Sequence, residues 1–402
     1  MKAASTAIII GGGVIGLSTA YHLAQKGFGR IILLEKEKIG DGSSSRAGGI
    51  VTGLLWTETG VAARKISLSR YSELSEELND YGYTYQNVGC LNLFDPASWA
   101  DRQPLLGLYD EFQAPYELLD AAEINYRWPE LTPLEDITGL YDPLGGYSEP
   151  EHYLPALTQG CQALGVEIRE GEMVEQIVSE SGQVRGVKTQ NGLIEADVVI
   201  CTVHTWALQL LASLDWELPM QAVVHQRYLT APLTAPVNIP AVNANPYEGY
   251  IRPAHGNRLL VGGETPERIT FNVPSLNFRM DGLKAPEGLE RVLYKAICQL
   301  TPRLKETKWA SEQVGLLSFS MDEEPIVGEA PHVKNLFIGG AFHSGGFAYN
   351  PAAGVLLAEL AADGETQIDI SAFSPKRFGL DSTRNFLKQA HPKKKDGVSR
   401  RH

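Results

Sequence analysis

Three glycines and one acidic residue near the start of the chain have the types and spacing of a dinucleotide-binding motif. Gly11, Gly13 and Gly16 form G-x-G-x-x-G, and Glu35 follows nineteen residues after the last of them. In this motif the first glycine makes a turn, the second lets backbone approach a pyrophosphate, and the third lets a helix pack against a strand. A carboxylate at that distance can accept hydrogen bonds from ribose hydroxyls. The residues therefore predict a dinucleotide site, for either FAD or NAD(P).

The segments around these residues have the pattern of a strand, a turn, a helix and a second strand. An apolar run at 7–10 precedes the glycines, apolar residues at helical spacing follow up to Gly27, and a second apolar run at 31–34 ends in the acid. Short continuous apolar runs are typical of strands buried on both faces. The consecutive glycines and the polar residues after them argue against a signal peptide or a membrane span. The helix N-terminus would supply N–H groups and partial positive charge for phosphates.

A second set of polar residues follows Glu35 in the loop 36–49. The loop contains three consecutive serines and Arg46, whose hydroxyl and guanidinium groups can bond phosphate oxygens. Gly48 and Gly49 would let main chain lie against a flat ring. Because the loop directly follows the acid, a second phosphate contact is favoured over a flexible surface loop.

The segment 335–364 repeats the opening pattern near the other end of the chain. A strand runs into glycines around His343 and Ser344, and the glycines run into an apolar helix. A helix N-terminus aimed at the ligand can stabilise negative charge there. The pattern favours a second contact with the same ligand, and an ordinary strand–helix connection is the alternative.

Length and charge limit the classes of protein and partner. The 402 residues predict two or three domains, and the net charge of −13 argues against nucleic acid as a general partner. Four scattered cysteines indicate neither a zinc site nor a disulfide framework, and no metal site is expected. A reducing, cytoplasmic location fits best, with peripheral membrane attachment as the alternative for a quinone-linked enzyme. The basic stretch 391–402 predicts a disordered, solvated tail.

The middle of the chain predicts a division into two domains. A helix is expected over 149–165, and alternating strands from 166 to 195 predict a three-stranded meander before a strand at 198–201. Frequent prolines and alternating apolar runs elsewhere predict an antiparallel sheet. The expected parts are a dinucleotide-binding domain of 1–85, 145–216 and 311–378, a substrate domain of 86–144 and 217–310, and a basic polar tail of 379–402.

With these pieces in place, the chain resembles the D-amino acid oxidase superfamily of FAD-dependent oxidoreductases, and within it the group of sarcosine oxidase, dimethylglycine dehydrogenase and glycine oxidase. The resemblance covers residues 7 to about 378 and is most specific in "YIRPAHGNRLLVGGE", "GLLSFSMDEEPIVG" and "GGAFHSGGFAYNPAAG", in that order. It implies an α/β fold with a Rossmann-type FAD-binding domain and a substrate domain on an antiparallel sheet (α+β). It also implies oxidation of the C–N bond of a small amino acid or N-methylated amine by hydride transfer to flavin N5. The residues expected to contact FAD are Gly11, Gly13, Val14, Ile15, Gly16, Glu35, Lys36, Ser43, Ser44, Ser45, Arg46, Ala47, Gly48, Gly49, Val174, Thr202, Trp206, Gly315, Gly340, His343, Ser344, Gly345, Gly346 and Phe347.

Some departures from the resembled group concern how the flavin is held. Gly315 stands where relatives with a cysteine-linked flavin carry that cysteine. No histidine lies between His22 and His152, so the histidyl link that other relatives make in this region is also missing. The sequence therefore predicts FAD bound without a covalent link. Where the group usually has Ala-Ala-Gly-x-Trp, residues 202–206 read Thr-Val-His-Thr-Trp, and His204 has no assigned role.

Tyr250 and Arg252 are the candidates for holding a substrate carboxylate. Glycine oxidase carries an arginine for this purpose where this chain has Leu317. Two residues apart on a strand, Tyr250 and Arg252 share one face, and arginine binds a carboxylate through two parallel hydrogen bonds. An exposed arginine on a surface strand is the alternative. For His343, beside the flavin, a structural hydrogen bond and proton transfer both stay open, and no obligatory general base is assigned.

The electron acceptor is predicted from a missing lysine. Oxidases of the sarcosine oxidase branch place a lysine against the flavin, and here Leu260 or Val261 occupies that position. A fixed cation there would stabilise superoxide, so we expect a dehydrogenase that uses a quinone or a protein rather than oxygen. Two other functions stay open. One is an NAD(P)-linked reductase, which would need a second glycine motif, and the other is a non-catalytic assembly factor with the FAD fold.

Overall fold

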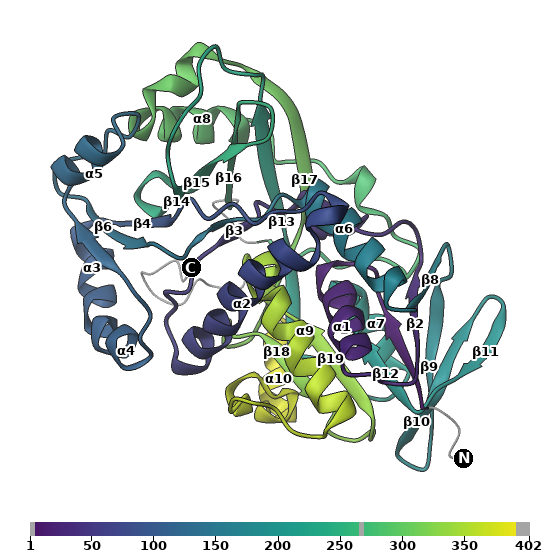
Figure 1. Cartoon of the computed structure of the whole chain (residues 1–402). Coiled ribbons are helices and arrows are strands. Elements are labelled where there is room, and N and C mark those ends of the chain that lie inside the picture. Colours follow the sequence, from purple (N-terminus) through teal and green to yellow (C-terminus); the bar gives the residue numbers. More distant parts are fainter. Residues whose placement is uncertain (1–4, 265–268, 391–402) are drawn as a thin grey trace.

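Two large β-sheets organise the chain (Figure 1). The computed structural model describes residues 5–264 and 269–390. The first sheet has six strands in the order β18-β19-β12-β1-β2-β8, parallel throughout except between β18 and β19. Its strands are β1 (Thr6–Ile10), β2 (Arg30–Glu35), β8 (Glu167–Glu170), β12 (Val198–Cys201), β18 (Ile326–Glu329) and β19 (Leu336–Gly340).

Alternating side chains of this parallel sheet build two separate cores. Ile9 and Leu33 face a helical layer, whereas Ile8 and Leu34 face a small three-stranded sheet on the other side. Because both faces are covered, the strands read as continuous apolar runs. The helical layer contains α1 (Val14–Gln25), α2 (Glu58–Glu77), α6 (Pro150–Ala163) and α9 (Gly346–Ala362), and the opposite layer contains β9 (Val174–Glu180), β10 (Gln183–Thr189), β11 (Gly192–Glu195) and α7 (Ala207–Ala212). The expected helix at 149–165 and the expected meander are both present.

Two glycines let the helical layer approach closely. A Cβ at Gly16 would lie 1.9 Å from the carbonyl oxygen of Gly11, so the first turn of α1 rests directly on the end of β1. A Cβ at Gly354 of α9 would lie 2.2 Å from Oγ of Ser18 in α1. The first contact holds α1 on β1 and the second holds α9 beside α1, with both N-termini at the same end of the sheet (Figure 1).

The second sheet has nine strands in the order β20-β17-β13-β16-β15-β14-β4-β6-β5 and occupies the upper part of Figure 1. Its pairings are antiparallel except between β14 and β4. Its strands are β4 (Cys90–Phe94), β5 (Glu117–Leu119), β6 (Thr138–Asp142), β13 (Met220–Thr230), β14 (Ala241–Ala244), β15 (Gly249–Ala254), β16 (Arg258–Glu264), β17 (Trp309–Ser320) and β20 (Phe342–His343). A two-stranded ribbon, β3 (Ile50–Val51) with β7 (Gly146–Tyr147), lies between the parts.

The expected domain boundary at residue 311 does not follow this sheet. Strand β17 pairs with β13 over almost its whole length, and β20 pairs with β17, so both belong to the nine-stranded sheet. The sheet is covered on its outer side by α8 (Leu289–Leu300) and α5 (Ala121–Arg127), while α3 (Pro96–Arg102) and α4 (Leu106–Glu111) follow β4. Within the described residues, no helix combines the length and apolarity needed to cross a membrane.

The expected polar tail from residue 379 is wrong for its first part. Residues Leu380–Leu387 form helix α10, in which Phe386 is buried against Val223 and Phe319 of the nine-stranded sheet. The amide of Gln221 donates to the carbonyl oxygen of Phe386 at 3.0 Å. The helix is short and its apolar residues are few, which is why composition alone did not reveal it. Residues 391–402 lie outside the described part of the chain.

Candidate active site

A cavity lies where the parallel strands end and the nine-stranded sheet begins. Its lining includes Ile10, Glu35 and Gly340 from the ends of β1, β2 and β19, together with His225 and Tyr250 from the nine-stranded sheet. Residues of both sheets therefore line one cavity, which is open to solvent in part.

One end of the cavity has the features of an ADP site. Helix α1 begins after Gly13, and the backbone N–H of Val14 donates to Oγ of Ser44 at 3.0 Å, which brings the serine loop onto the helix N-terminus. The carboxylate of Glu35 accepts from the backbone N–H of Gly12 at 2.8 Å. Burial raises the pKa of this carboxyl, although backbone donors counteract it. A carboxylate so placed still has lone pairs for ribose hydroxyls.

Residues 276–281 cross this end of the cavity as a strap that the sequence did not reveal. Lys36 Nζ donates to the carbonyl oxygens of Leu276 and Phe278 at 2.9 and 2.5 Å and lies 4.2 Å from the ring centroid of Trp206. Burial lowers the pKa of Lys36. Lys36, a predicted cofactor contact, lines the cavity, but its ammonium group bonds the strap and holds it in place.

Arg46 also lines the cavity but uses its N–H groups within the protein. It donates to the carbonyl oxygens of Asp41 and Gly42, and it pairs with the carboxylate of Asp281 at 2.8 Å. Its alkyl chain covers Gly315, where a Cβ would lie 3.1 Å from Cδ of Arg46. A larger residue at position 315 would have to displace this arginine.

The second glycine-rich turn closes the other end. Gly340, His343 and Ser344 line the cavity, and α9 begins there. Ala341 and His343 have φ values of +56° and +52°, a conformation that side-chain-bearing residues rarely adopt. Strained backbone of this kind is found at many active sites and ligand-binding turns. Nδ1 of His343 lies 3.1 Å from Oγ of Ser344.

Tyr250 and His225 form a polar pair on the part of the cavity wall that the nine-stranded sheet provides. The Tyr250 ring lies between two glycines: a Cβ at Gly48 would lie 2.7 Å from its Cε2, and a Cβ at Gly262 would lie 2.2 Å from its Cζ. Its hydroxyl lies 3.0 Å from Nε2 of His225, and the two rings are stacked. The pair is therefore held in one orientation at the cavity surface.

The predicted role of Arg252 as a substrate clamp is not supported by its position. Arg252 shares a face of β15 with Tyr250 as expected, but it is fully buried and does not line the cavity. Its Nη1 and Nη2 donate to both carboxylate oxygens of Glu149 at 2.9 and 3.0 Å, and its Nε donates to the carbonyl oxygen of Gly48 at 2.5 Å. The guanidinium thus already holds a carboxylate of the protein itself.

A second buried arginine of the same sheet bonds the same loop. Nη2 of Arg227 donates to the carbonyl oxygen of Ser45 at 2.9 Å. Burial alone would raise the pKa of the Glu149 carboxyl, but Arg252, the backbone N–H of His255 and Arg227 together bring it below its usual value. Arg227 and Arg252 therefore tie the loop 43–49 to the nine-stranded sheet.

Most residues predicted to contact the cofactor line this cavity, and three do not. Gly16 lies beneath the glycine turn, Ser45 accepts hydrogen bonds from Arg227 and Arg46, and Gly345 packs against Arg64. The cavity also contains residues that the sequence reasoning missed, among them His204, His225, Asn243, Asn245 and the strap at 276–281. They come from strands and loops without a local motif, so only the pairing of distant strands reveals them.

Comparisons with known proteins identify the family. The profile described as "FAD dependent oxidoreductase" (DAO) matches residues 6–360. The 4-methylaminobutanoate oxidase (formaldehyde-forming) of Paenarthrobacter nicotinovorans is 31% identical over 98% of this chain and 48% of that protein. The sarcosine oxidase subunit beta of an Arthrobacter species is 27% identical over 92% of this chain and 90% of that protein. The crystal structure of L-proline dehydrogenase from P. horikoshii matches with a TM-score of 0.83 at 23% identity, covering 94% of this chain and 98% of that one.

The chain spans about half the length of the first curated relatives that it matches. The region of similarity nevertheless includes both glycine-rich turns and the strands between them. Two helix N-termini and the carboxylate of Glu35, all at one cavity, fit the cofactor of that family. This chain belongs to the DAO family of FAD-dependent oxidoreductases.

Proposed function

We propose that this protein oxidises the C–N bond of a small amino acid or N-methylated amine to an imine, which water then hydrolyses. One observation carries the proposal: a single cavity joins the dinucleotide end, at Gly13 and Glu35, to the polar pair of Tyr250 and His225. The relatives named for oxidation of sarcosine, 4-methylaminobutanoate and proline support this class of substrate.

The roles of the cavity residues follow from their positions. The N-terminus of α1 and Glu35 would hold the ADP half of FAD, and Gly48 together with the N-terminus of α9 would lie against the flavin. Bound FAD would supply the hydride acceptor. The amine would lie against Tyr250 and His225, and a hydrogen-bonded phenol–imidazole pair can hold the nitrogen in its neutral form and accept its proton. His343 and Ser344 would contribute a structural hydrogen bond at the other edge.

The electron acceptor, the identity of the cofactor, the catalytic role and the cellular compartment are also proposals. Leu260 and Val261 are buried apolar residues of β16, in agreement with a dehydrogenase that passes electrons to a quinone or a protein. The match to an FAD family favours FAD over NAD(P), and the polar pair in the cavity favours catalysis over an assembly role. All four cysteines are free and buried, which fits a reducing compartment such as the cytoplasm.

Under anaerobic conditions, addition of a substrate is expected to bleach the absorbance of the bound flavin. A panel of N-methylated, cyclic and unsubstituted small amino acids, with amines that lack a carboxylate, identifies the substrate. Chemical reduction of the same sample serves as the control for a competent flavin. If the chemical reductant bleaches the flavin and no member of the panel does, the proposed function is wrong and the assembly role is favoured.

Removing the hydroxyl of Tyr250 is expected to lower kcat without loss of FAD. In Tyr250→Phe the ring keeps its place between Gly48 and Gly262, whereas the contact with His225 disappears. Acid–base groups contribute about 10²–10⁴-fold, and we expect a decrease of at least about 10-fold in the rate of flavin reduction. Single-turnover reduction and the FAD dissociation constant are the measurements. An unchanged reduction rate would remove Tyr250 from the mechanism.

A further inference from the structure

His204 is a histidine of the cavity wall with unusual backbone and unusual burial. It lies between β12 and α7, lines the cavity and has φ of +53°. A residue with a side chain is strained in this conformation, and glycine is not. Glycine, which the resembled group has at this position of its motif, is free of this strain. A histidine keeps this conformation only where its surroundings hold it there.

Its two ring nitrogens have different surroundings. Nδ1 is buried and has no hydrogen-bond partner among the described residues. The residue as a whole is only partly buried, and Nε2 is not among the buried atoms without a partner, so Nε2 is the accessible nitrogen. Burial lowers the pKa of His204 to about 4, so the ring is neutral at pH 7 and carries one N–H. An orphaned buried N–H is rarer than an orphaned buried acceptor, so the proton belongs on Nε2.

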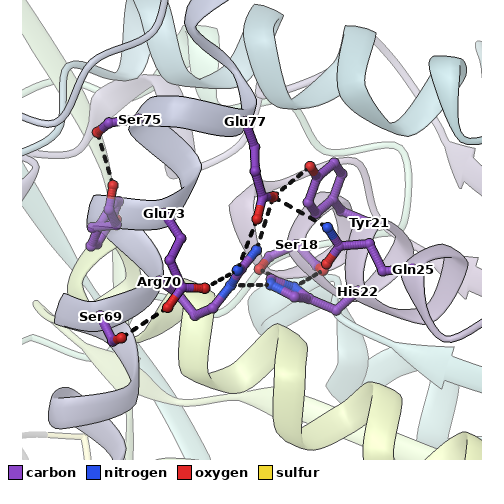
Figure 2. Close-up of polar contacts among 10 residues, drawn as sticks. Ser18, Tyr21, His22, Gln25, Ser69, Arg70, Glu73, Ser75 and Glu77 are labelled. Carbon is purple, nitrogen blue, oxygen red and sulfur yellow. Dashed lines mark hydrogen bonds and ion pairs between the residues drawn. The ribbon is translucent and has the colours of Figure 1, made fainter.

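A second buried histidine shows what a purely structural histidine looks like in this chain. Figure 2 shows His22 of α1 among polar side chains of α1 and α2. Its Nδ1 bonds the carbonyl oxygen of Ser18 at 2.7 Å, and its Nε2 accepts from Nε of Arg70 at 3.1 Å. Burial lowers the pKa of His22 to about 4 as well. Both nitrogens of His22 are satisfied by the fold, whereas those of His204 are not.

The neighbours of His204 place it at the ADP end of the cavity. A Cβ at Gly11 would lie 3.0 Å from Cγ1 of Val203, so the residue before His204 touches the phosphate-binding turn. Two residues after it, the Trp206 ring lies under Nζ of Lys36, next to the ribose-binding acid. His204 is therefore between the sites expected for the pyrophosphate and for the adenosine.

We propose that Nε2–H of His204 donates a hydrogen bond to an oxygen of the ADP half of bound FAD, and that the strained backbone at this position is kept for that contact. The proposal rests on FAD binding by this family and not on the identity of the amine substrate. It makes His204 a cofactor-holding residue particular to chains that replace the motif glycine.

Three substitutions separate the hydrogen bond from the backbone strain. His204→Phe keeps a flat ring and the strain but has no N–H, His204→Gly removes both, and His204→Gln keeps a donor at similar reach. The FAD dissociation constant, measured from the fluorescence of FAD released on dilution of holoprotein, is expected to rise about 10- to 100-fold in the Phe and Gly variants, as for a lost hydrogen bond to a charged group. The Gln variant is expected to stay within about threefold of the original chain.

Melting of the apoprotein made from each holoprotein supplies the second readout. The Gly variant is expected to melt at the same temperature as the original apoprotein or higher, since it relieves strain. His22→Leu, the structural control, is expected to lower the melting temperature of apoprotein and holoprotein alike and to leave FAD affinity unchanged. Unchanged FAD affinity in the Phe and Gly variants overturns the proposal, as does a Gln variant as weak as Phe. No substrate enters this titration, so failure of the amine-oxidation proposal is seen separately.

Discussion

Replacement of Gly13 by valine is expected to give a folded protein without FAD. Gly13 is the N-cap of α1 with φ of −79° and ψ of 179°, a conformation open to any residue. A Cβ there would lie 3.0 Å from Oγ of Ser44 and would meet no backbone atom. The added methyl groups would occupy the space where a pyrophosphate reaches the helix N-terminus. Loss of two or more hydrogen bonds between backbone N–H groups and the pyrophosphate costs about 3 kcal/mol or more. The affinity for FAD would then decrease at least about 100-fold.

Gly16→Val is the matched control, because its Cβ would lie 1.9 Å from a backbone oxygen. We expect that variant to lose stability, measured by thermal melting, whereas Gly13→Val keeps the melting temperature of the apoprotein and loses only flavin absorbance. The original protein should release its FAD on heating, because Gly315, which lies beneath Arg46, has no side chain that could form a covalent link to the flavin. A yellow Gly13→Val protein would contradict the assigned phosphate site, and flavin that stays on denatured protein would contradict non-covalent binding.

The parts of the site that could be predicted from the sequence are those whose residues lie close together in one short segment of the chain. The turn at 11–16, its strand and helix and Glu35 lie within thirty residues, and each has a local signature in turn chemistry or apolar periodicity. The glycine-rich segment at 335–364 is equally local. These segments end at the cavity because parallel strands bring their carboxyl ends to one edge of the sheet.

The rest of the site depends on strand pairing between distant residues. His225 contacts Tyr250 because β13 pairs with β16 and β16 pairs with β15. No sequence pattern in β13 indicates the register of these pairings. Arg252 illustrates the same limit. Its strand and its face were predicted, but its partner Glu149 lies 103 residues earlier in the chain. A guanidinium suited to a substrate carboxylate is equally suited to a carboxylate of the protein.

Replacement of Arg252 by leucine is expected to destabilise the protein rather than to change which substrates it accepts. The side chain of Arg252 is 0% exposed and that of Glu149 is 13% exposed, so the variant would leave a largely buried carboxylate without its partner. Removing one member of a buried pair costs about 3–5 kcal/mol. The loop carbonyl of Gly48 would also lose its donor. Urea unfolding measures the loss, and amines with and without a carboxylate should be affected equally.

The double variant Arg252→Leu with Glu149→Leu is the control, since replacing a whole buried pair by apolar residues is often close to neutral.

The pH dependence of stability supplies an independent test. Because the folded pKa of Glu149 is lowered, the pair stabilises the original protein fully above the usual carboxyl pKa and loses this contribution as the pH falls through the folded value. In Arg252→Leu, burial without a partner raises the pKa of the Glu149 carboxyl. As the pH falls, protonation removes the buried charge, and the variant regains part of the lost stability. The difference in unfolding free energy between the two proteins should therefore be largest near pH 7. It should shrink as the pH falls through the raised pKa of the variant and then through the lowered pKa of the original protein. A difference that stays constant to low pH, or a loss confined to carboxylate substrates, would return Arg252 to the role of a substrate clamp.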